Sequence, residues 1–218
     1  MAEAAQRPTD IQYKRYMTLV HRFRQNGYRL ANFAVYDPFF TTLTILAERK
    51  LAEIAEDLKF ESQAKERAER LLQGLESRLW SPELKRYRYF DAISQRFEET
   101  YTSGSLSPVI LGEEIKGYDA LLYALRSDFL REGGVPTVAP SSESYDPVCY
   151  WRGPIWVNMN WLFSHADETI RQKTLALVDK EGFWEYFNPE NGKGLGADQF
   201  TWTAALVLDL LSNEEFLV

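Results

Sequence analysis

Apolar residues recur every three or four positions along most of this 218-residue chain, and this spacing lines one face of an α-helix. Two stripes near the N-terminus show the pattern: Tyr13, Tyr16, Met17, Val20 and Phe23, then Leu43, Ala47, Leu51, Ile54 and Leu58. A helix with such a stripe buries one face and leaves the other in water. The repeated pattern predicts an all-α protein.

Residues that favour helix ends bound the first two segments. Thr9 or Asp10 is placed to cap a first helix, and Gly27 ends it. Asp37 can cap a second helix, because its side chain accepts hydrogen bonds from free N–H groups and Pro38 is tolerated in a first turn.

Five further helices are predicted, over 62–79, 118–130, 154–165, 167–182 and 200–211. The segments 154–165 and 200–211 are apolar on almost every side, whereas 62–79 has a charged face. A helix that is apolar all round is expected to be buried. Two kinds of helix suggest two concentric layers, an inner ring inside an outer one.

Four segments interrupt the helical pattern. Aromatic strand formers in 86–91 and 96–101 predict a short β-hairpin. The loops 133–151 and 182–199 each lead to a buried helix, and loops this long inside a compact domain are functional or disordered. The aromatic residues that follow the first loop favour function. The two loops are therefore expected to meet and build a cleft.

The charge balance excludes several classes of partner. The net charge of -7 leaves no basic stripe for nucleic acid or for an anionic membrane surface. No run reaches the about 18 apolar residues of a membrane span. Residues 1–10 are polar and do not resemble a signal peptide, so a cytoplasmic location is expected.

Neither a metal site nor a cofactor is expected. Cys149 is the single cysteine, and His21 and His165 are the two histidines, which excludes an internal disulfide and disfavours a cysteine or histidine metal site. The G-x-G-x-G run at 192–196 does not match a phosphate-binding loop, because no strand precedes it and no Lys-Ser/Thr pair follows.

The stretch 150–161 holds three of the chain's six tryptophans, next to one arginine and two asparagines. Aromatic faces beside fixed polar groups suit a sugar, because its C–H face can stack while its hydroxyls bind at the rim. The alternative is a buried, Trp-rich helix start whose Arg152 pairs with a structural carboxylate.

Glu185 lies in the second loop, between the aromatic pairs at 183–184 and 186–187. A carboxylate in an apolar setting loses hydration and becomes a stronger proton acceptor, which makes Glu185 a candidate general base. The alternative is a glutamate that pairs with a neighbouring arginine, such as Arg152, for structural reasons.

Several blocks of sequence resemble glycoside hydrolase family 63, and in particular its bacterial mannosylglycerate and glucosylglycerate hydrolases. The blocks are Tyr-Trp-Arg-Gly-Pro-Ile-Trp at 150–156, Glu-Tyr-Phe-Asn-Pro-Glu-Asn-Gly at 185–192 and Gly-Leu-Gly-Ala-Asp-Gln-Phe-Thr-Trp-Thr-Ala-Ala at 194–205, with further matches at 32–40 and 134–142. The likeness extends over nearly the whole chain, and the first two blocks in this order are its most specific parts.

The resemblance implies an (α/α)6 barrel of six inner and six outer helices, and an inverting mechanism. In an inverting glycosidase one acid protonates the leaving-group oxygen while one base activates water on the opposite face of the sugar. By resemblance, Glu185 is the general base. The residues that would line the substrate cleft are Tyr150, Trp151, Arg152, Trp156 and Trp202. Arg152 also suits the carboxylate of a glycerate or another anionic aglycone.

The chain departs from the family pattern in one respect. The family's general acid is an aspartate in a segment resembling Ser-Gly-Met-Asp-Asn-Ser, and no such segment occurs here. About seven helices are predicted where a full barrel needs twelve. Residues 1–218 are therefore expected to form a single partial catalytic domain, the C-terminal half of an incomplete (α/α)6 barrel. Its exposed apolar flanks predict self-association, pairing with a missing N-terminal half, or partial stability.

Three functions remain open on the sequence. The first is the C-terminal portion of a hydrolase of a small α-glucosyl or α-mannosyl conjugate, weak or inactive alone because it lacks the acid. The second is an inactive carbohydrate-binding or assembly module derived from that family. The third is a helical scaffold with a Trp-rich core.

Overall fold

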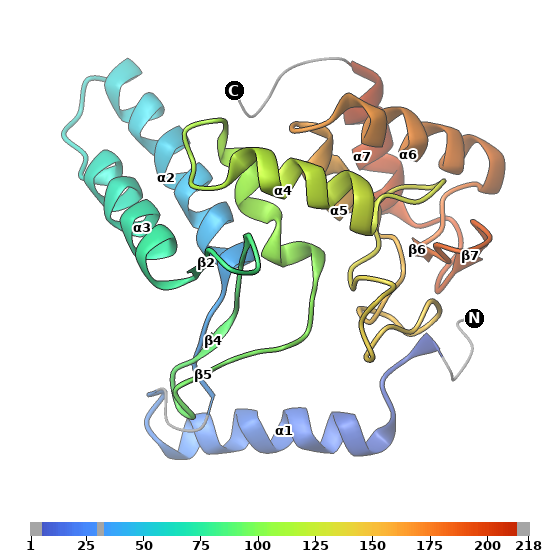
Figure 1. Ribbon diagram of the computed structural model, residues 1–218, viewed down its shortest axis with the longest axis horizontal. Helices are drawn as coiled ribbons and strands as arrows, with labels where there is room; N and C mark the ends of the chain where they lie inside the picture. The colour runs from blue at the N-terminus through green and yellow to red at the C-terminus, as the bar shows by residue number, and fades with distance from the viewer. Residues whose placement is uncertain (1–5, 30–32, 213–218) are drawn as a thin grey trace.

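The computed structural model describes residues 6–29 and 33–212, and most of its regular structure is helical (Figure 1). The seven α-helices in these ranges are α1 (Asp10–Gln25), α2 (Pro38–Asp57), α3 (Ala64–Arg78), α4 (Tyr118–Ala124), α5 (Val157–Ser164), α6 (Glu168–Glu181) and α7 (Thr201–Ser212). The π-helix η4 (Leu125–Phe129) continues α4, and the 3₁₀-helices η2 (Ser103–Ser105) and η3 (Ser107–Leu111) precede it. All seven predicted helices are present.

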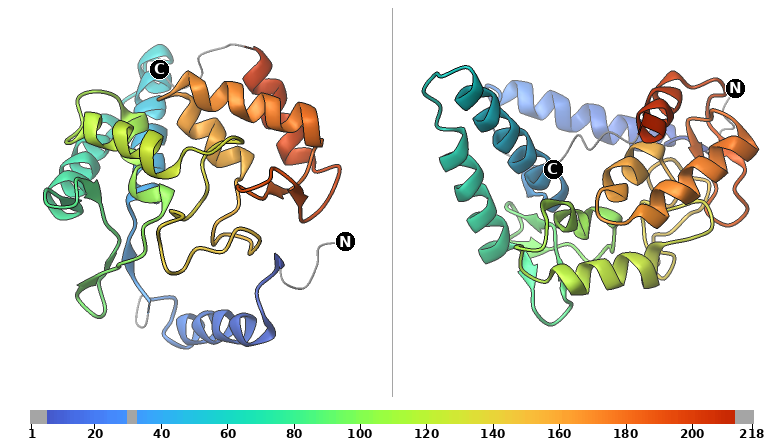
Figure 2. Two further views of the ribbon diagram at one scale, coloured as in Figure 1. Left: turned by 45° about the vertical axis from the view of Figure 1, so that its right-hand side comes forward. Right: turned by 90° about the horizontal axis from the view of Figure 1, so that it is seen from above.

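The helices form two groups joined by shorter elements (Figures 1 and 2). Helices α2 and α3 pack together on one side, and α5, α6 and α7 pack together on the other. The short helix η3 contacts α2, α4 and α5, so it connects the two groups. Helix α1 lies apart from both groups and has no buried residue.

Side chains cap the starts of three helices, and the caps at Thr9 and Asp37 confirm the prediction. The side chain of Thr9 accepts a hydrogen bond from the N–H of Gln12, whose side chain accepts in return from the N–H of Thr9. The Asp37 carboxylate accepts from the first-turn N–H groups of α2. Asp167 accepts from Thr169 N at 3.0 Å and so caps α6. These ends depend on neighbours in sequence, which is why the sequence predicts them.

The start of α5 differs from the prediction that Pro154 lies in its first turn. The helix begins at Val157, because Ile155 is drawn into extended pairing with Phe187. The N–H of each of these two residues donates to the carbonyl of the other at 2.8 Å. The turn that Pro154 was expected to start is therefore an extended strand-like segment, and Trp156 becomes the residue before the helix.

The predicted hairpin of 86–91 with 96–101 is only partly present. Strand β3 (Arg86–Tyr87) pairs with β2 (Trp80–Ser81), whereas β4 (Phe90–Asp91) pairs with β5 (Arg96–Phe97) and with β1 (Val35–Tyr36). The segment thus contributes to two small sheets. A third sheet, of two strands, joins β6 (Tyr186–Phe187) to β7 (Gly194–Leu195).

Asn160, on α5, anchors the loop 133–151 to the helices. Its Oδ1 accepts from Val135 N at 2.8 Å, and its Nδ2 donates to Gly133 O at 3.1 Å and to Thr174 Oγ1 at 2.8 Å. Gly134 has a φ of +127°, and a Cβ there would lie 2.0 Å from Asn160 Nδ2. The loop can approach α5 this closely only because position 134 is glycine.

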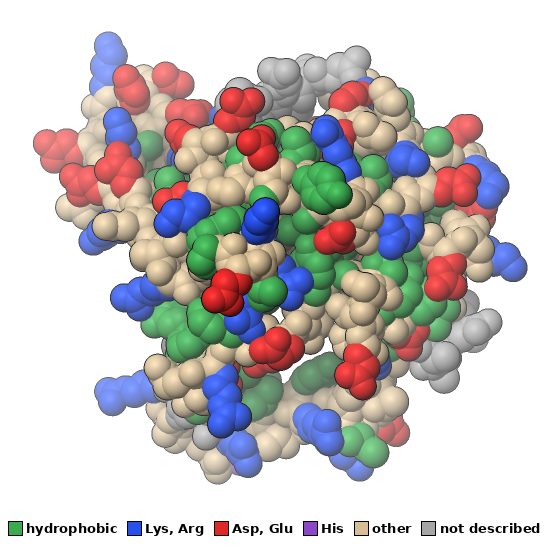
Figure 3. All heavy atoms as spheres, in the orientation of Figure 1, with side chains coloured by type: hydrophobic (Ala, Val, Ile, Leu, Met, Phe, Trp, Pro, Cys, Tyr) green, Lys and Arg blue, Asp and Glu red, His purple; other side chains and the backbone are tan. Residues whose placement is uncertain are grey.

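Apolar side chains remain exposed on several helices, including α1 and α7. Tyr13, Met17 and Val20 of α1 are exposed, and so are Leu208 and Leu211 of α7. Acidic and basic side chains mix over the face shown in Figure 3, with hydrophobic side chains visible between them. Within the described ranges, no helix is both long enough and apolar enough to cross a membrane.

The cap of α2 gives a direct test of the fold. Asp37→Ala removes the acceptor of Phe39 N at 2.8 Å and Phe40 N at 3.2 Å. We expect the free energy of unfolding to fall by about 1 kcal/mol, while Asp37→Asn, an equally good cap, stays near the parent value. Urea denaturation followed by tryptophan fluorescence measures both. Equal losses in the two variants would contradict a capping role.

Candidate functional site

Three aromatic rings from two segments of the chain form one stack. The rings of Trp151 and Trp156 lie 4.1 Å apart at 5°, and Trp156 lies 4.9 Å from Tyr186 at 23°. Tyr150 meets Trp156 and Tyr186 edge-on, at 5.2 and 5.6 Å. The structure therefore brings the predicted residues Tyr150, Trp151 and Trp156 together. Tyr150 and Trp156 contact Tyr186, the residue that follows Glu185.

The tryptophans in and beside the stack differ in how much of each residue is exposed to solvent. Trp156 is only 3% exposed, and its two faces are covered by Trp151 and Tyr186. Trp151 is 42% exposed, and Trp202, which meets Trp156 at 6.5 Å, is 46% exposed. Trp151 and Trp202 thus offer ring surface to a ligand, whereas Trp156 supports Trp151 from behind.

Tyr150 has an unusual backbone. Its φ is +36°, a region that residues other than glycine seldom adopt. The Tyr150 carbonyl accepts a hydrogen bond from Trp156 Nε1 at 2.9 Å. The ring contacts and this hydrogen bond hold the end of the first loop in place.

Glu185 is buried, with 6% of the residue exposed. Both of its oxygens accept from Arg7: Oε1 from Nη1 at 3.1 Å and Oε2 from Nη2 at 2.7 Å. Oε2 also accepts from Ala197 N at 3.1 Å, and Glu185 N donates to the Ala197 carbonyl at 2.9 Å. The carboxylate is thus held by the Arg7 side chain, near the N-terminus, and by the backbone N–H of Ala197, in the second loop.

Arg7 was not found by sequence reasoning. It lies 178 positions before Glu185, and only a buried carboxylate in need of a cation could have indicated such a partner. The Arg7 guanidinium also lies 4.9 Å from the centre of the Tyr150 ring. Burial lowers the pKa of Arg7, but the hydrogen bond and charge of Glu185 more than offset this and raise it above the ordinary value.

Gln6, which precedes Arg7, also forms hydrogen bonds near Glu185. Its carbonyl accepts from the Tyr186 hydroxyl at 3.1 Å, and its Oε1 accepts from Gly196 N at 3.1 Å. Burial raises the pKa of Tyr186 to about 12, so its hydroxyl remains a donor at neutral pH. Residues 6–7 therefore tie the start of α1 to the β6–β7 hairpin.

Two glycines of the second loop, Gly194 and Gly196, leave space that neighbouring side chains of the protein occupy. Gly196 has a φ of +77°, and a Cβ there would lie 2.5 Å from Glu185 Oε2. A Cβ on Gly194 would lie 2.0 Å from the indole of Trp184. Position 196 must therefore be glycine for Glu185 to occupy its place.

Arg152 does not pair with Glu185. Its Nε and Nη2 both donate to the Ser144 carbonyl at 3.3 Å, and these hydrogen bonds are exposed. The arginine that pairs with Glu185 is therefore Arg7, and not Arg152, which the sequence suggested. Arg152 keeps further N–H donors for a ligand, since a guanidinium has five.

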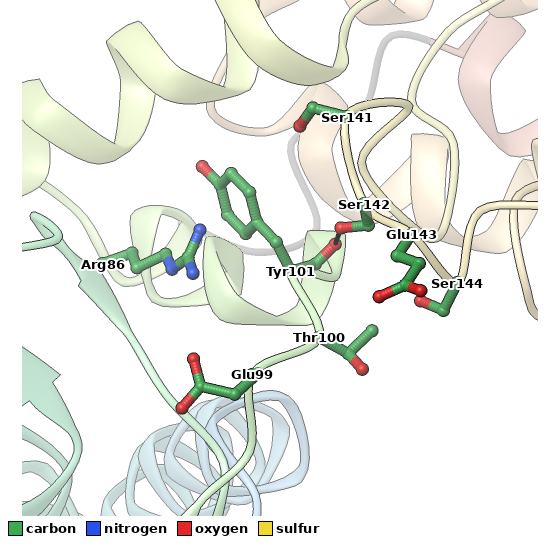
Figure 4. A pocket seen from close by; sticks show the side chains of 8 residues that line it. All are labelled: Arg86, Glu99, Thr100, Tyr101, Ser141, Ser142, Glu143 and Ser144. Atoms are coloured by element: carbon green, nitrogen blue, oxygen red, sulfur yellow. Dashed lines mark hydrogen bonds between the residues drawn. The ribbon is translucent and has the colours of Figure 1, made fainter.

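The first loop also lines a pocket away from the stack (Figure 4). This cavity of about 470 Å³ lies between Arg86 and Tyr101 on one side and residues 141–144 on the other. Glu99 and Glu143 bring negative charge to it. The Arg86 guanidinium lies 3.8 Å from the centre of the Tyr101 ring and covers one face of it. This mixed-charge pocket lacks the exposed indoles of the stack.

In the described part of the chain, no three His, Cys, Asp or Glu side chains lie close enough together to hold a metal ion. Glu185 offers a buried carboxylate whose neighbour in sequence, Tyr186, belongs to the aromatic stack. A carboxylate of this kind can accept a proton, and the exposed ring of Trp151 can stack on a polar ring.

The chain is similar to known glycoside hydrolases. Residues 1–203 match the mannosylglycerate hydrolase MGH1-like glycoside hydrolase domain. The mannosylglycerate hydrolase of Rubrobacter radiotolerans is 36% identical, over 94% of this chain and 51% of its own length. The glucosylglycerate hydrolase of Mycolicibacterium hassiacum is 31% identical, over 97% of this chain and 53% of its own.

Solved structures support the same grouping. The GH63 mannosylglycerate hydrolase from Thermus thermophilus in complex with Tris superposes with a TM-score of 0.87 at 29% identity, over 97% of this chain and 55% of that one. Neutral trehalase Nth1 from Saccharomyces cerevisiae superposes at 0.64 with 14% identity, over 96% of this chain and 44% of that one, a likeness of fold alone. Both neighbours are (α/α)6 toroids.

The chain spans about half the length of the curated relatives that it matches. It therefore belongs to the mannosylglycerate hydrolase MGH1-like family of glycoside hydrolases and corresponds to the C-terminal half of its members.

Proposed function

We propose that this chain is the general-base portion of an inverting glycoside hydrolase that acts on a small α-glucosyl or α-mannosyl conjugate, such as glucosylglycerate or mannosylglycerate. Residues 1–218 would form one partial (α/α)6 domain. The observation that carries the proposal is the buried carboxylate of Glu185 beside the indole stack. The relatives named for hydrolysis of mannosylglycerate and glucosylglycerate support the choice of substrate.

The contacts of Glu185 favour one oxygen as the base. Oε2 accepts two hydrogen bonds, from Arg7 and from Ala197, whereas Oε1 accepts one. A carboxylate oxygen has about two lone-pair sites, so Oε1 keeps one for a water molecule. In the proposed step this water gives a proton to Oε1 as its oxygen bonds to the anomeric carbon and the glycosidic bond breaks.

The leaving-group oxygen needs a proton from a second carboxyl group. In inverting enzymes this acid stands about 6.5–9.5 Å from the base. The sequence has no counterpart of the family's aspartate segment, so we expect the isolated chain to be weak or inactive. A non-catalytic carbohydrate-binding or assembly module is the second candidate, and the exposed apolar faces of α1 and α7 favour it.

The exposure of each predicted side chain decides which contact with the substrate we assign to it. Trp151 and Trp202 would stack on the ligand, with Trp156 behind Trp151 and Tyr150 fixing the stack edge-on. Arg152, which is exposed and keeps free donors, would bind an anionic aglycone.

Substitution of Glu185 tests the base. We expect Glu185→Gln to lower hydrolysis of glucosylglycerate and mannosylglycerate by about 10²–10⁴-fold, because an amide cannot accept the proton of the attacking water. A sensitive assay of glycerate release measures this, with Glu190→Gln as the control, since Glu190 is exposed on the same hairpin. Full activity of the chain, unaffected by Glu185→Gln, would refute both the role and the expected weakness.

The ion pair has its own test. Arg7→Met leaves a buried carboxylate without its cation, and because about a third of the Arg7 side chain meets solvent we expect a loss of only about 1–2 kcal/mol in the free energy of unfolding. The double variant Arg7→Met with Glu185→Gln should recover part of this loss. Urea unfolding of the parent, the two single variants and the double variant gives the coupling free energy between residues 7 and 185. Purely additive losses would contradict an interaction between the two side chains.

The apolar stripe of α1 predicts self-association. Replacing Tyr13, Met17 and Val20 by serine should reduce association without destabilising the chain, because all three side chains are exposed. Light scattering after size-exclusion chromatography at several concentrations measures the mass, with Arg15→Gln on another face of α1 as the control. A parent chain that is monomeric and melts sharply at every concentration would contradict this expectation.

A further inference from the structure

The pocket of Figure 4 lies outside the aromatic stack and has no part in the proposed reaction. Its volume of about 470 Å³ is within the range of small-molecule sites. One wall is the 141–144 part of the first loop, and the other holds Arg86 and Tyr101. Among the described residues, neither Glu185 nor any tryptophan lines it, so a ligand bound here would not occupy the place assigned to the substrate.

Arg86 is held at this pocket without a carboxylate partner. It lies in β3, whose pairing with β2 fixes its backbone. Its guanidinium lies 3.8 Å from the centre of the Tyr101 ring, a contact that leaves the N–H groups at the guanidinium edge available. Within the described ranges Arg86 forms no ion pair, and Glu99 pairs with Arg88 at 2.8 Å instead. This wall therefore presents a cation in a fixed position, ready to bind a carboxylate.

The facing wall carries the opposite charge and a hydroxyl group without a partner. Glu143 is exposed and forms no ion pair with any residue that the structure describes. Ser144 Oγ is buried without a hydrogen bond. The backbone here is fixed, because the Ser144 carbonyl accepts from Arg152 and Ser142 N donates to the Ala139 carbonyl. An unpaired buried oxygen costs free energy unless a ligand or water binds it, so Ser144 Oγ points to a ligand with a donor group.

The two unpaired charges line one pocket from opposite sides and do not contact each other (Figure 4). A ligand with only a negative charge would be repelled by Glu99 and Glu143, and one with only a positive charge would be repelled by Arg86. A ligand that carries both charges, at the two ends of a short chain, can bind both walls. Because these groups meet solvent, we expect weak binding that decreases as salt increases.

We propose that this pocket binds a small zwitterionic amino acid. The carboxylate of the ligand accepts hydrogen bonds from Arg86, and its ammonium group pairs with Glu143. The same ammonium group donates to Ser144 Oγ, which gives this buried oxygen its partner. The assignment does not depend on the proposed hydrolysis, because neither the base nor the aromatic stack takes part in it.

A set of three related compounds tests the need for both charges. The probe is γ-aminobutanoate, whose charges lie at the two ends of its carbon chain, and butanoate and butylammonium each keep one of them. In an NMR titration at neutral pH, γ-aminobutanoate should shift the backbone amide signals of Ser142 and Ser144 and leave that of Thr18, on α1, in place. Each compound with a single charge should bind about tenfold more weakly, which corresponds to about 1.4 kcal/mol.

Substitutions then assign each charge of the ligand to one wall. Glu143→Gln, an exposed change, should weaken γ-aminobutanoate about tenfold and leave butanoate as in the parent. Arg86→Met should weaken γ-aminobutanoate to a similar extent and leave butylammonium no weaker. Glu98→Gln and Arg96→Met are the matched controls, since both residues are exposed and lie outside the lining, and both should bind as the parent does. Thermal melts confirm that each variant is folded.

Three outcomes would overturn the zwitterion site: no shift at Ser142 and Ser144, equal affinity for γ-aminobutanoate and either compound with a single charge, or equal affinity in the parent and in folded Glu143→Gln. Equality with butanoate would reduce the pocket to an anion site at Arg86. This proposal and the proposed base fail separately, because hydrolysis that is insensitive to Glu185→Gln leaves the titration unchanged.

Discussion

The ion pair between Arg7 and Glu185 is the contact on which the candidate site depends. It joins the segment before α1 to the β6–β7 hairpin, and hydrogen bonds from Tyr186 and Gly196 to Gln6 reinforce it. Arg7 supplies the positive charge that offsets part of the cost of burying this carboxylate. The pair therefore fixes the direction in which Glu185 presents its oxygens, and with it the chemistry available beside the indole stack.

Most of the fold could be predicted from the sequence because its helix ends are local. Thr9, Asp37 and Asp167 lie within three residues of the N–H groups that they cap, so their roles are visible in a short window. Pro154 shows the opposite case. The usual preference of proline for a first helical turn was overridden by backbone hydrogen bonds between Ile155 and Phe187, which no local pattern contains.

The part of the candidate site that is local in sequence could be predicted, as the helix ends could. The aromatic residues at 150–156 are close in sequence, so their grouping was visible, and Glu185 stood out between its aromatic neighbours. What the sequence could not give is which ring face is covered. Tyr186 and Trp151 enclose Trp156 only after two distant segments meet. Arg152 was the nearest cation in sequence, whereas the actual partner, Arg7, lies at the other end of the chain.

The positive φ of Tyr150 links the order of a loop to the packing of rings. A non-glycine residue in this region carries about 1–3 kcal/mol of backbone strain, so neighbouring contacts must hold it there. Those contacts are the rings of Trp156 and Tyr186. A change of this one backbone angle would move the Tyr150 ring relative to both rings that it contacts. The course of the loop and the packing of these rings are therefore coupled through a single residue.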